Sequence, residues 1–254
     1  ASITQNRRVD FLGFSCYCST DLLRWENCGL VLPSITKPGH DLSPNAVCER
    51  PCVLYNPASK TFVMWFHQDN ADYSRARAGV AVSQKPNGPF EYLGSMLPGG
   101  YDSRDLTVFA DASGTAYLFC SSDWNSSMRI WELDTTYTGF TGTGKTILAE
   151  QSREAPAVFF HEGLYYMVSS GCTGWYPNSM LYAVSPALLG NWRLMGEPCT
   201  GPCARRTFGG QSAHIFRAAN RHYVLLDHWN PDDLQHSGYS ILPIEITDGF
   251  LTIP

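Results

Sequence analysis

One pattern recurs four times along the chain: a polar residue is followed by an apolar strand-like run, a tight turn and a second apolar run. The four copies begin at Glu49, Asp105, Glu154 and Gln211, at spacings of 56, 49 and 57 residues. Internal repeats of this period, built from short strands and turn residues, are typical of the blades of a β-propeller. The recurrence therefore predicts an all-β fold with one blade for each copy.

The four leading residues predict a site. In a propeller the innermost strand of each blade lines the central channel, so residues at the same register point toward one axis. Two glutamates, an aspartate and a glutamine would then converge on one funnel. Ordinary solvation of a strand edge would explain any one of them taken alone, but the fourfold recurrence favours a shared site.

Residues 11–33 look like the outer half of a blade. Their order of strand, turn and aromatic-led strand returns at residues 78–90 and 180–192, where it follows an inner pair of strands. Only ten residues precede Phe11, whereas the other copies use 23 to 28 residues between the leading polar residue and the third strand. We therefore expect one propeller domain over residues 1–254 with five blades, four complete and the first lacking its inner strands.

Composition narrows the class of protein. Charged residues make up 16% and aromatic residues 13% of the 254 residues, which fits a folded chain rich in strand formers. The net charge of −5, without any basic run, argues against a nucleic-acid partner. No apolar stretch approaches the roughly 20 residues needed to span a bilayer. Residues 137–144, rich in Thr and Gly, fit a loop.

Cysteine usage points to an oxidising compartment. Nine cysteines are present, so at least one has no partner within the chain, and Cys48/Cys52 and Cys199/Cys203 are close pairs. This favours disulfides, with buried reduced thiols as the alternative. Asn125-Ser126-Ser127 is an N-glycosylation sequon, and the chain begins at Ala1 without Met. We expect a secreted, disulfide-containing glycoprotein in a mature or truncated form.

Two of the leading carboxylates suit glycoside hydrolysis. An inverting glycosidase needs a general acid to protonate the leaving oxygen and a base that activates water on the opposite face. Glu154 stands beside Pro156 and an apolar run, where partial desolvation would raise its pKa into the range of a useful acid. Asp105, on the neighbouring blade, could orient Glu154 and keep it protonated.

These residues resemble a known family. Residues 102–111 and 153–156, with the Tyr165-Tyr166 strand, look like the inner-strand motifs of glycoside hydrolase family 43, whose fold is a five-bladed β-propeller. Several further motifs are most similar to its exo-β-1,3-galactanase branch, namely residues 47–51, 63–67, 174–178 and 211–212. The resemblance runs from about residue 11 to the C-terminus.

The resemblance implies a role for each leading residue. Glu154 would be the general acid, and Asp105 would tune and orient it. Glu49 would bind sugar hydroxyls at the cleavage subsite, and Gln211 would lie near the attacking water. A neutral amide can position water but is a poor base, so Glu49 is the alternative base.

Aromatic and polar residues near the axis are expected to bind substrate. The site residues proposed for this are Trp175, Trp65, His67, Asn178 and Asp227. Trp175 lies in a Gly- and Pro-flanked loop and is the better stacking platform, whereas Trp65, inside an apolar run, could equally be core. His67, Asp227 and His228 could be funnel ligands or structural hydrogen-bond partners.

The resemblance also bears on cofactors. No cofactor is required for the expected reaction, although many relatives carry a structural metal, often calcium, on the propeller axis. His214 could line such a site, but a lone histidine is more often a satisfied core residue.

The expected gap in the first blade leaves alternatives open. The strand that supplies an acidic residue in this family is absent, so a second chain or another segment would have to complete the site. The leading hypothesis is an inverting hydrolase that cleaves galactose from β-1,3-galactan or arabinogalactan-type polysaccharide. The alternatives are a catalytically inactive, carbohydrate-binding or structural propeller of an extracellular assembly and, less favoured, an intracellular scaffold.

Overall fold

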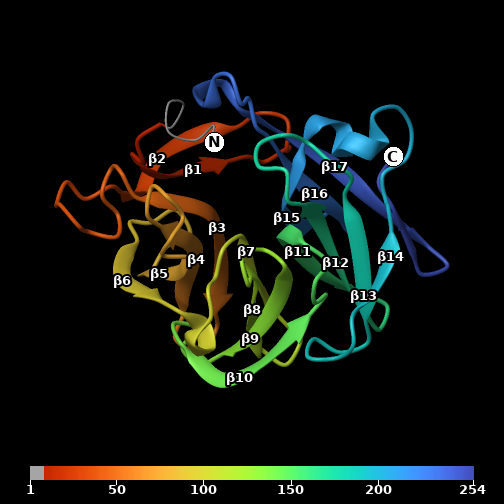
Figure 1. Cartoon of the computed structure of the whole chain (residues 1–254), viewed down its shortest axis with the longest axis horizontal. Helices are drawn as coiled ribbons and strands as arrows, with labels where there is room; N and C mark the ends of the chain where they lie inside the picture. The colour runs from red at the N-terminus through yellow and green to blue at the C-terminus, as the bar shows by residue number, and fades with distance from the viewer. Residues whose placement is uncertain (1–8) are drawn as a thin grey trace.

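The computed structural model describes residues 9–254, and in this range the chain forms five antiparallel sheets around a common centre (Figure 1). Four sheets have four strands each, hydrogen-bonded in chain order: β3–β6, β7–β10, β11–β14 and β15–β18. The remaining sheet has two strands, β1 and β2. The expected all-β propeller architecture is thus confirmed, while the count of five blades stays a prediction.

The strands are short and follow one another through tight turns. The first ten are β1 (Gly13–Cys18), β2 (Glu26–Pro33), β3 (Val47–Asn56), β4 (Thr61–Asp69), β5 (Arg77–Ser83), β6 (Glu91–Met96), β7 (Leu106–Ala110), β8 (Ala116–Ser122), β9 (Ser127–Leu133) and β10 (Phe140–Ile147). The others are β11 (Arg153–His161), β12 (Leu164–Gly171), β13 (Leu181–Ser185), β14 (Arg193–Gly196), β15 (Gln211–Ala218), β16 (Arg221–His228), β17 (Gly238–Thr247) and β18 (Phe250–Thr252). Three short 3-10 helices complete this part of the chain: η2 (Pro98–Gly100), η3 (Ala204–Gly209) and η4 (Leu234–His236).

The hydrophobic core lies between neighbouring sheets. Trp65 of β4 and Leu118 of β8 belong to one buried cluster, and Phe119 and Met167 belong to the next. A third cluster joins Tyr166 of β12 to Leu226 of β16. Because these clusters lie between successive sheets, the apolar runs of the sequence are buried, and the first residues of the inner strands are left to face the centre.

One strand was not predicted from the sequence. Residues 137–144 were expected to form a loop, but β10 occupies Phe140–Ile147 as the outer strand of its blade. Gly144 is required there because a Cβ atom at this position would lie 2.3 Å from the Trp131 ring. Glycine in this strand therefore marks close packing of an indole and not a turn.

The cysteines are free thiols in the described range. Cys48 packs beside the cluster between β1–β2 and β3–β6, whereas Cys52 belongs to the cluster on the other face of that blade. Cys199 is buried and Cys203 is exposed. The expectation of disulfides within these two pairs is not confirmed. No helix in residues 9–254 is long and apolar enough to cross a membrane.

Candidate active site

Backbone irregularities aim the leading residues at the centre of the molecule. The register shifts between Glu49 and Cys52 in β3, between Glu154 and Ala157 in β11, and between Ser212 and His214 in β15. Arg50 and Ala155, which directly follow two of the leading residues, have positive φ values of 56° and 53°. A bulge redirects the side chains around it. Three inner strands have such an irregularity near their first residues, where the strands approach the axis.

Glu154 is a buried carboxyl group with a raised pKa and an amide partner on each carboxyl oxygen. Its side chain is buried, with 8% of the residue exposed. Oε1 accepts a hydrogen bond from Nε2 of Gln211 at 3.0 Å, and Oε2 accepts one from Nδ2 of Asn125 at 3.2 Å. Burial, and secondly the charge of Asp105, raise the pKa of Glu154 to about 8. Glu154 therefore keeps its proton at neutral pH, as a general acid must.

Gln211 uses its whole hydrogen-bonding capacity. Nε2 donates to Glu154 and, at 2.8 Å, to Oγ of Ser170. Oε1 accepts from Nε1 of Trp229 at 3.0 Å and from Nη2 of Arg50. Two donor hydrogens and two lone pairs are all that a side-chain amide offers. Gln211 thus holds Glu154 in orientation, and in this arrangement the amide has no free donor or acceptor for a water molecule.

Arg50 joins three blades at the centre of the site. Nη1 donates to Oδ2 of Asp227 at 2.7 Å and to the carbonyl oxygen of Ser212 at 2.8 Å. Nε lies 3.4 Å from Oδ2 of Asp105. Burial lowers the pKa of Arg50, but Asp105 and Asp227 raise it overall. The guanidinium therefore stays charged and holds both carboxylates in place.

Glu49 lies in a second hydrogen-bonded group at the axis. Oε1 accepts from the Tyr73 hydroxyl at 2.8 Å, and Oε2 lies 3.7 Å from Nδ1 of His67. Burial raises the pKa of Glu49, but the contacts with His67 and Tyr73 lower it overall. Its side chain is 32% exposed. Glu49 is consequently an ionised carboxylate with access to solvent, the opposite state to Glu154.

His67 is a buried residue that lies between two carboxylates, Asp69 and Glu49. The residue is 2% exposed, and Nε2 lies 2.9 Å from Oδ2 of Asp69. Burial lowers the pKa of His67, but the contact with Asp69 and the nearby Glu49 carboxylate raise it to about 9. His67 is therefore a charged, buried partner that positions Glu49.

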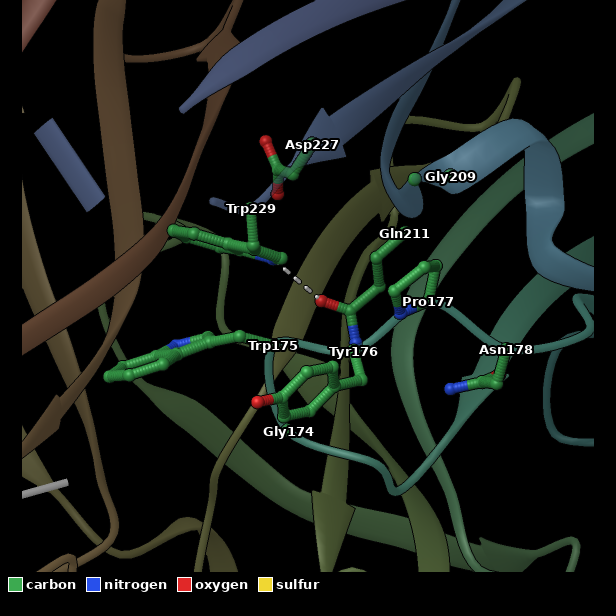
Figure 2. Close-up of a pocket in the computed structure, with 10 residues that line it drawn as sticks. Gly174, Trp175, Tyr176, Pro177, Asn178, Gly209, Gln211, Asp227 and Trp229 are labelled. Atoms are coloured by element: carbon green, nitrogen blue, oxygen red, sulfur yellow. Dashed lines mark hydrogen bonds between the residues drawn. The ribbon is translucent and has the colours of Figure 1, made fainter. Parts of the chain in front are cut away.

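A pocket adjoins Gln211 and is walled by two indoles (Figure 2). Trp175 and Trp229 lie on the same side of it, and the Gln211 amide points toward Trp229. Asp227 also lines the pocket, while its carboxylate is held by Arg50. Asn178 lines the pocket too, but its side-chain amide is bonded to both backbone groups of Gly171. Trp175 is thus available for stacking, and Asn178 secures the loop that carries it.

Trp65 does not reach the site. It is completely buried in the cluster between two blades, and Nε1 donates to the carbonyl oxygen of Tyr137 at 2.8 Å. The expectation that Trp65 stacks on sugar is therefore wrong. An indole with a partner for its N–H and no exposed face is core.

The surroundings of His214 do not fit calcium. Nδ1 lies 3.6 Å from Sγ of Cys52, which also contacts Oγ1 of Thr107 at 3.6 Å. Calcium takes six to eight oxygen ligands, and a thiol is a poor one. A second group, Glu49, His67 and Asp105, has ligand atoms within 4.8 Å of one another, and Nε2 of His67 lies 2.9 Å from Asp69.

Several contributors to the site were not singled out from the sequence, among them Arg50, Trp229 and Asn125. Arg50 is adjacent to Glu49, and Trp229 follows the strand that carries Asp227. Their roles depend on a positive φ value and on contacts between blades, which have no local sequence signal. In the sequence Asn125 is part of a sequon, and a sequon gives no indication of a contact with Glu154.

Comparisons with known proteins agree with this architecture. The sequence matches glycosyl hydrolases family 43 over residues 2–236. A GH43 β-1,3-galactosidase solved with galactodeoxynojirimycin is 33% identical, with a TM-score of 0.92 over 97% of this chain and 88% of that one. A variant of the exo-β-1,3-galactanase from Phanerochaete chrysosporium with β-1,3-galactotriose is 33% identical, with a TM-score of 0.90 over 97% of this chain and 57% of that one.

Two further relatives show how much of a longer protein the chain spans. The exo-β-1,3-galactanase from Clostridium thermocellum is 33% identical, with a TM-score of 0.87, and the match covers 96% of this chain and 56% of that one. The xylosidase/arabinosidase 43A of Humicola insolens is 39% identical over 56 residues, which is 22% of this chain and 17% of that protein. Since the family match extends over nearly the whole sequence, this chain belongs to glycosyl hydrolases family 43, a family of glycoside hydrolases.

Proposed function

We propose that this chain hydrolyses β-1,3-linked galactosyl units of galactan or arabinogalactan-type polysaccharide with inversion of configuration. The observation that carries the proposal is the state of Glu154, a buried carboxyl group whose pKa is raised to about 8 and which two side-chain amides hold. In this proposal Glu154 is the general acid and protonates the oxygen of the departing sugar.

The charges around Glu154 support that assignment. Asp105 raises its pKa, and Arg50 anchors the Asp105 carboxylate at 3.4 Å. When Glu154 gives up its proton, the carboxylate that forms is stabilised by the Asn125 and Gln211 amides and by the charge of Arg50. Before proton transfer the raised pKa keeps Glu154 protonated. After it, the Glu154 carboxylate has hydrogen-bond donors already in place.

We assign water activation to Glu49. A base must accept a proton, and the Gln211 carbonyl oxygen already accepts two hydrogen bonds. Glu49 is ionised and partly exposed, and Tyr73 and His67 hold it in orientation. Glu49 and Glu154 then divide base and acid between two carboxyl groups whose environments push their pKa values apart.

The relatives and the pocket support the proposed substrate class. One structural neighbour is a β-1,3-galactosidase, and another was solved with β-1,3-galactotriose. Trp175 and Trp229 wall the pocket beside Gln211 and offer apolar faces of the kind that pack on pyranose rings. Asp227 lines the same pocket and offers acceptors for sugar hydroxyls.

The test uses purified chain with β-1,3-galactan and follows released galactose and its anomeric form by NMR. We expect α-galactose as the first product, and its loss in Glu154→Gln. Binding without release by the unmutated chain would favour the alternative function of a carbohydrate-binding propeller. Azide tests the base: rescue of Glu49→Gln with an α-galactosyl azide product supports our assignment, and rescue of Gln211→Ala instead would transfer the role to Gln211.

We also propose that β1 and β2 are the outer half of a fifth blade, completed by strands from another segment or a second chain. In support, each of the other sheets has four strands, and β1 pairs only with β2 within residues 9–254. Sedimentation analysis tests the second-chain form of this proposal. A dimer that dissociates on substitution of Ser15 by Pro would support it, and a monomer with full activity would argue against it.

A further inference from the structure

The loop between β8 and β9 has an unusual backbone. Asp123, Trp124 and Asn125 have consecutive positive φ values of 53°, 56° and 65°. Asparagine and aspartate tolerate this region, but three such residues in a row, one of them tryptophan, persist only where the surroundings impose the conformation.

The surroundings of the loop do impose it. Oδ1 of Asp102 accepts the backbone N–H of Asp123 at 2.7 Å, and Oδ2 accepts that of Trp124 at 3.1 Å. The Arg104 guanidinium lies 4.1 Å from the centroid of the Trp124 ring. The backbone N–H of Ser152 donates to the carbonyl oxygen of Ser126 at 3.1 Å. The loop is thus fixed from several sides, with Asn125 directed at Glu154.

The side chain of Asn125 has one used and one unused end. Nδ2 donates to Oε2 of Glu154, while Oδ1 is buried and makes no hydrogen bond within the described residues. The two ends of a carboxamide exchange places by a turn about one bond. Nδ2 can therefore donate to the Glu154 carboxylate, and Oδ1 can accept from the protonated acid.

We propose that Asn125 is a positioning residue for the acid Glu154 in both of its protonation states, and that the sequon Asn125-Ser126-Ser127 is not a glycan acceptor. The inference rests on the proposed function of Glu154. N-glycosylation attaches sugar to Nδ2, the atom that donates to Glu154, so a glycan would remove this hydrogen bond and occupy the space beside the acid.

Two substitutions separate positioning from glycosylation. Asn125→Ala removes the amide and the sequon, whereas Ser127→Ala removes the sequon alone. With galactan, we expect kcat of Asn125→Ala to fall about tenfold or more, and the basic limb of its pH profile to move upward because the carboxylate loses a donor. With 4-nitrophenyl β-galactoside, whose leaving group needs less protonation, the loss should shrink. Ser127→Ala should behave as the unmutated chain.

Equal behaviour of the two variants in rate and pH profile would overturn the proposal. A glycan on Asn125 in active protein from a glycosylating host, detected by peptide mass spectrometry, would overturn it too. If the unmutated chain releases no galactose, the proposed function fails, and the ¹³C carboxyl titration of Glu154 then decides the positioning role. A Glu154 pKa unchanged between unmutated chain and Asn125→Ala would refute that role.

A second, independent observation concerns the β1–β2 hairpin. Cys16, Cys18 and Cys28 have sulfur atoms within 4.8 Å of one another, and Sγ of Cys18 lies 2.9 Å from that of Cys28. Cys16 pairs with Gly29 and Tyr17 pairs with Asn27, so Cys28 is the bulged residue of β2. A bulge redirects a side chain, and here it brings Cys28 to Cys18.

We infer that Cys18 and Cys28 are a disulfide-forming pair and that Cys16 is the third, free thiol. With oxidised glutathione, the Cys18 thiolate displaces one glutathione thiolate, and the Cys28 thiolate then displaces the other. One glutathione disulfide becomes two thiols, and the protein loses two thiol protons and two electrons. The bond would fasten a two-stranded sheet, which is marginally stable by itself.

Peptide mapping after thiol blocking tests the pair. We expect a Cys18–Cys28 linked peptide with alkylated Cys16, and a fall in Tm of about 5 °C on reduction. Cys18→Ser should lose this response to reductant, and Cys16→Ser should keep it. Three alkylated cysteines after glutathione treatment, a linkage through Cys16, or a metal ion retained stoichiometrically by mass spectrometry would each overturn the inference.

Discussion

Nε2 of Gln211 donates a hydrogen bond to Oε1 of Glu154 at 3.0 Å, while Trp229 and Arg50 donate to the carbonyl oxygen of the same amide. The orientation of Gln211 is therefore fixed by its neighbours, and the group facing Glu154 is neutral. A neutral partner leaves burial and Asp105 to set the pKa of Glu154.

Gln211→Glu should move the basic limb of the pH–rate profile, which reports the ionisation of Glu154 as the general acid. The introduced carboxylate would stand at hydrogen-bond distance from Glu154, and two adjacent carboxylates resist ionising together. We expect the basic limb of the kcat/KM profile to rise by about one pH unit or more. Ser170→Ala, which removes the other Nε2 partner without adding charge, is the control. An unmoved limb would mean that Gln211 and Glu154 are apart in solution.

Glu154→Gln should stabilise the protein in alkaline solution. The pKa of Glu154 is raised from 4.5 to about 8, so its contribution to stability is complete below pH 4.5 and is lost as the pH rises through 8. Differential scanning calorimetry should give equal Tm values for both proteins at pH 4.5, and a Tm about 3 °C or more higher for Glu154→Gln at pH 9. A lower Tm for the variant at pH 9 would contradict the burial of a charge.

His67 should make stability fall with rising pH. Its pKa is raised to about 9, above the ordinary 6.5, so the stabilisation is complete below pH 6.5 and disappears as the pH rises through 9. His67→Gln should therefore lower Tm by several degrees at pH 6 and by less at pH 10. A Tm difference that does not depend on pH would show that His67 is uncharged in the folded state.

Arg50→Ala should damage both stability and activity. Asp105 and Asp227 would be left without their cationic partner in a buried site, which costs about 3–5 kcal/mol for a broken buried ion pair. Urea unfolding measures the loss. In Arg50→Ala/Asp227→Asn one uncompensated charge is removed, so part of the stability should return. If the double variant is no more stable than Arg50→Ala, the pair is not coupled.

Substitution of Trp65 should lower the stability of the protein, whereas substitution of Trp175 should weaken substrate binding. Trp65→Ala empties a buried site and should cost about 3–5 kcal/mol of unfolding free energy. Trp175→Ala removes a half-buried pocket side chain, so its stability should change by about 1 kcal/mol or less, while KM for galactan rises about tenfold. Chemical denaturation and steady-state kinetics give the two numbers. The reverse pattern would place sugar stacking at Trp65.

The spacing of the polar strand starts was sufficient to predict the blades and the group Glu49, Asp105, Glu154 and Gln211, because propeller blades repeat one register around an axis. The sequence could not separate Trp65 from Trp175 as a platform, since an apolar run looks alike whether its indole faces a neighbouring blade or a pocket. It also suggested a loop at residues 137–144, where glycine instead makes room for an indole.

Charge states at the site were decided by the tertiary structure. Glu49 and Glu154 are the same residue type at the same point of the repeat, yet the pKa of one is lowered and that of the other is raised. The difference comes from partners on other strands: His67 and Tyr73 around Glu49, and Asp105 beside the buried Glu154. Sequence by itself determined that the four leading residues of the repeats approach one axis. Their protonation depends on burial and on neighbouring charges, which exist only once the blades have closed around them.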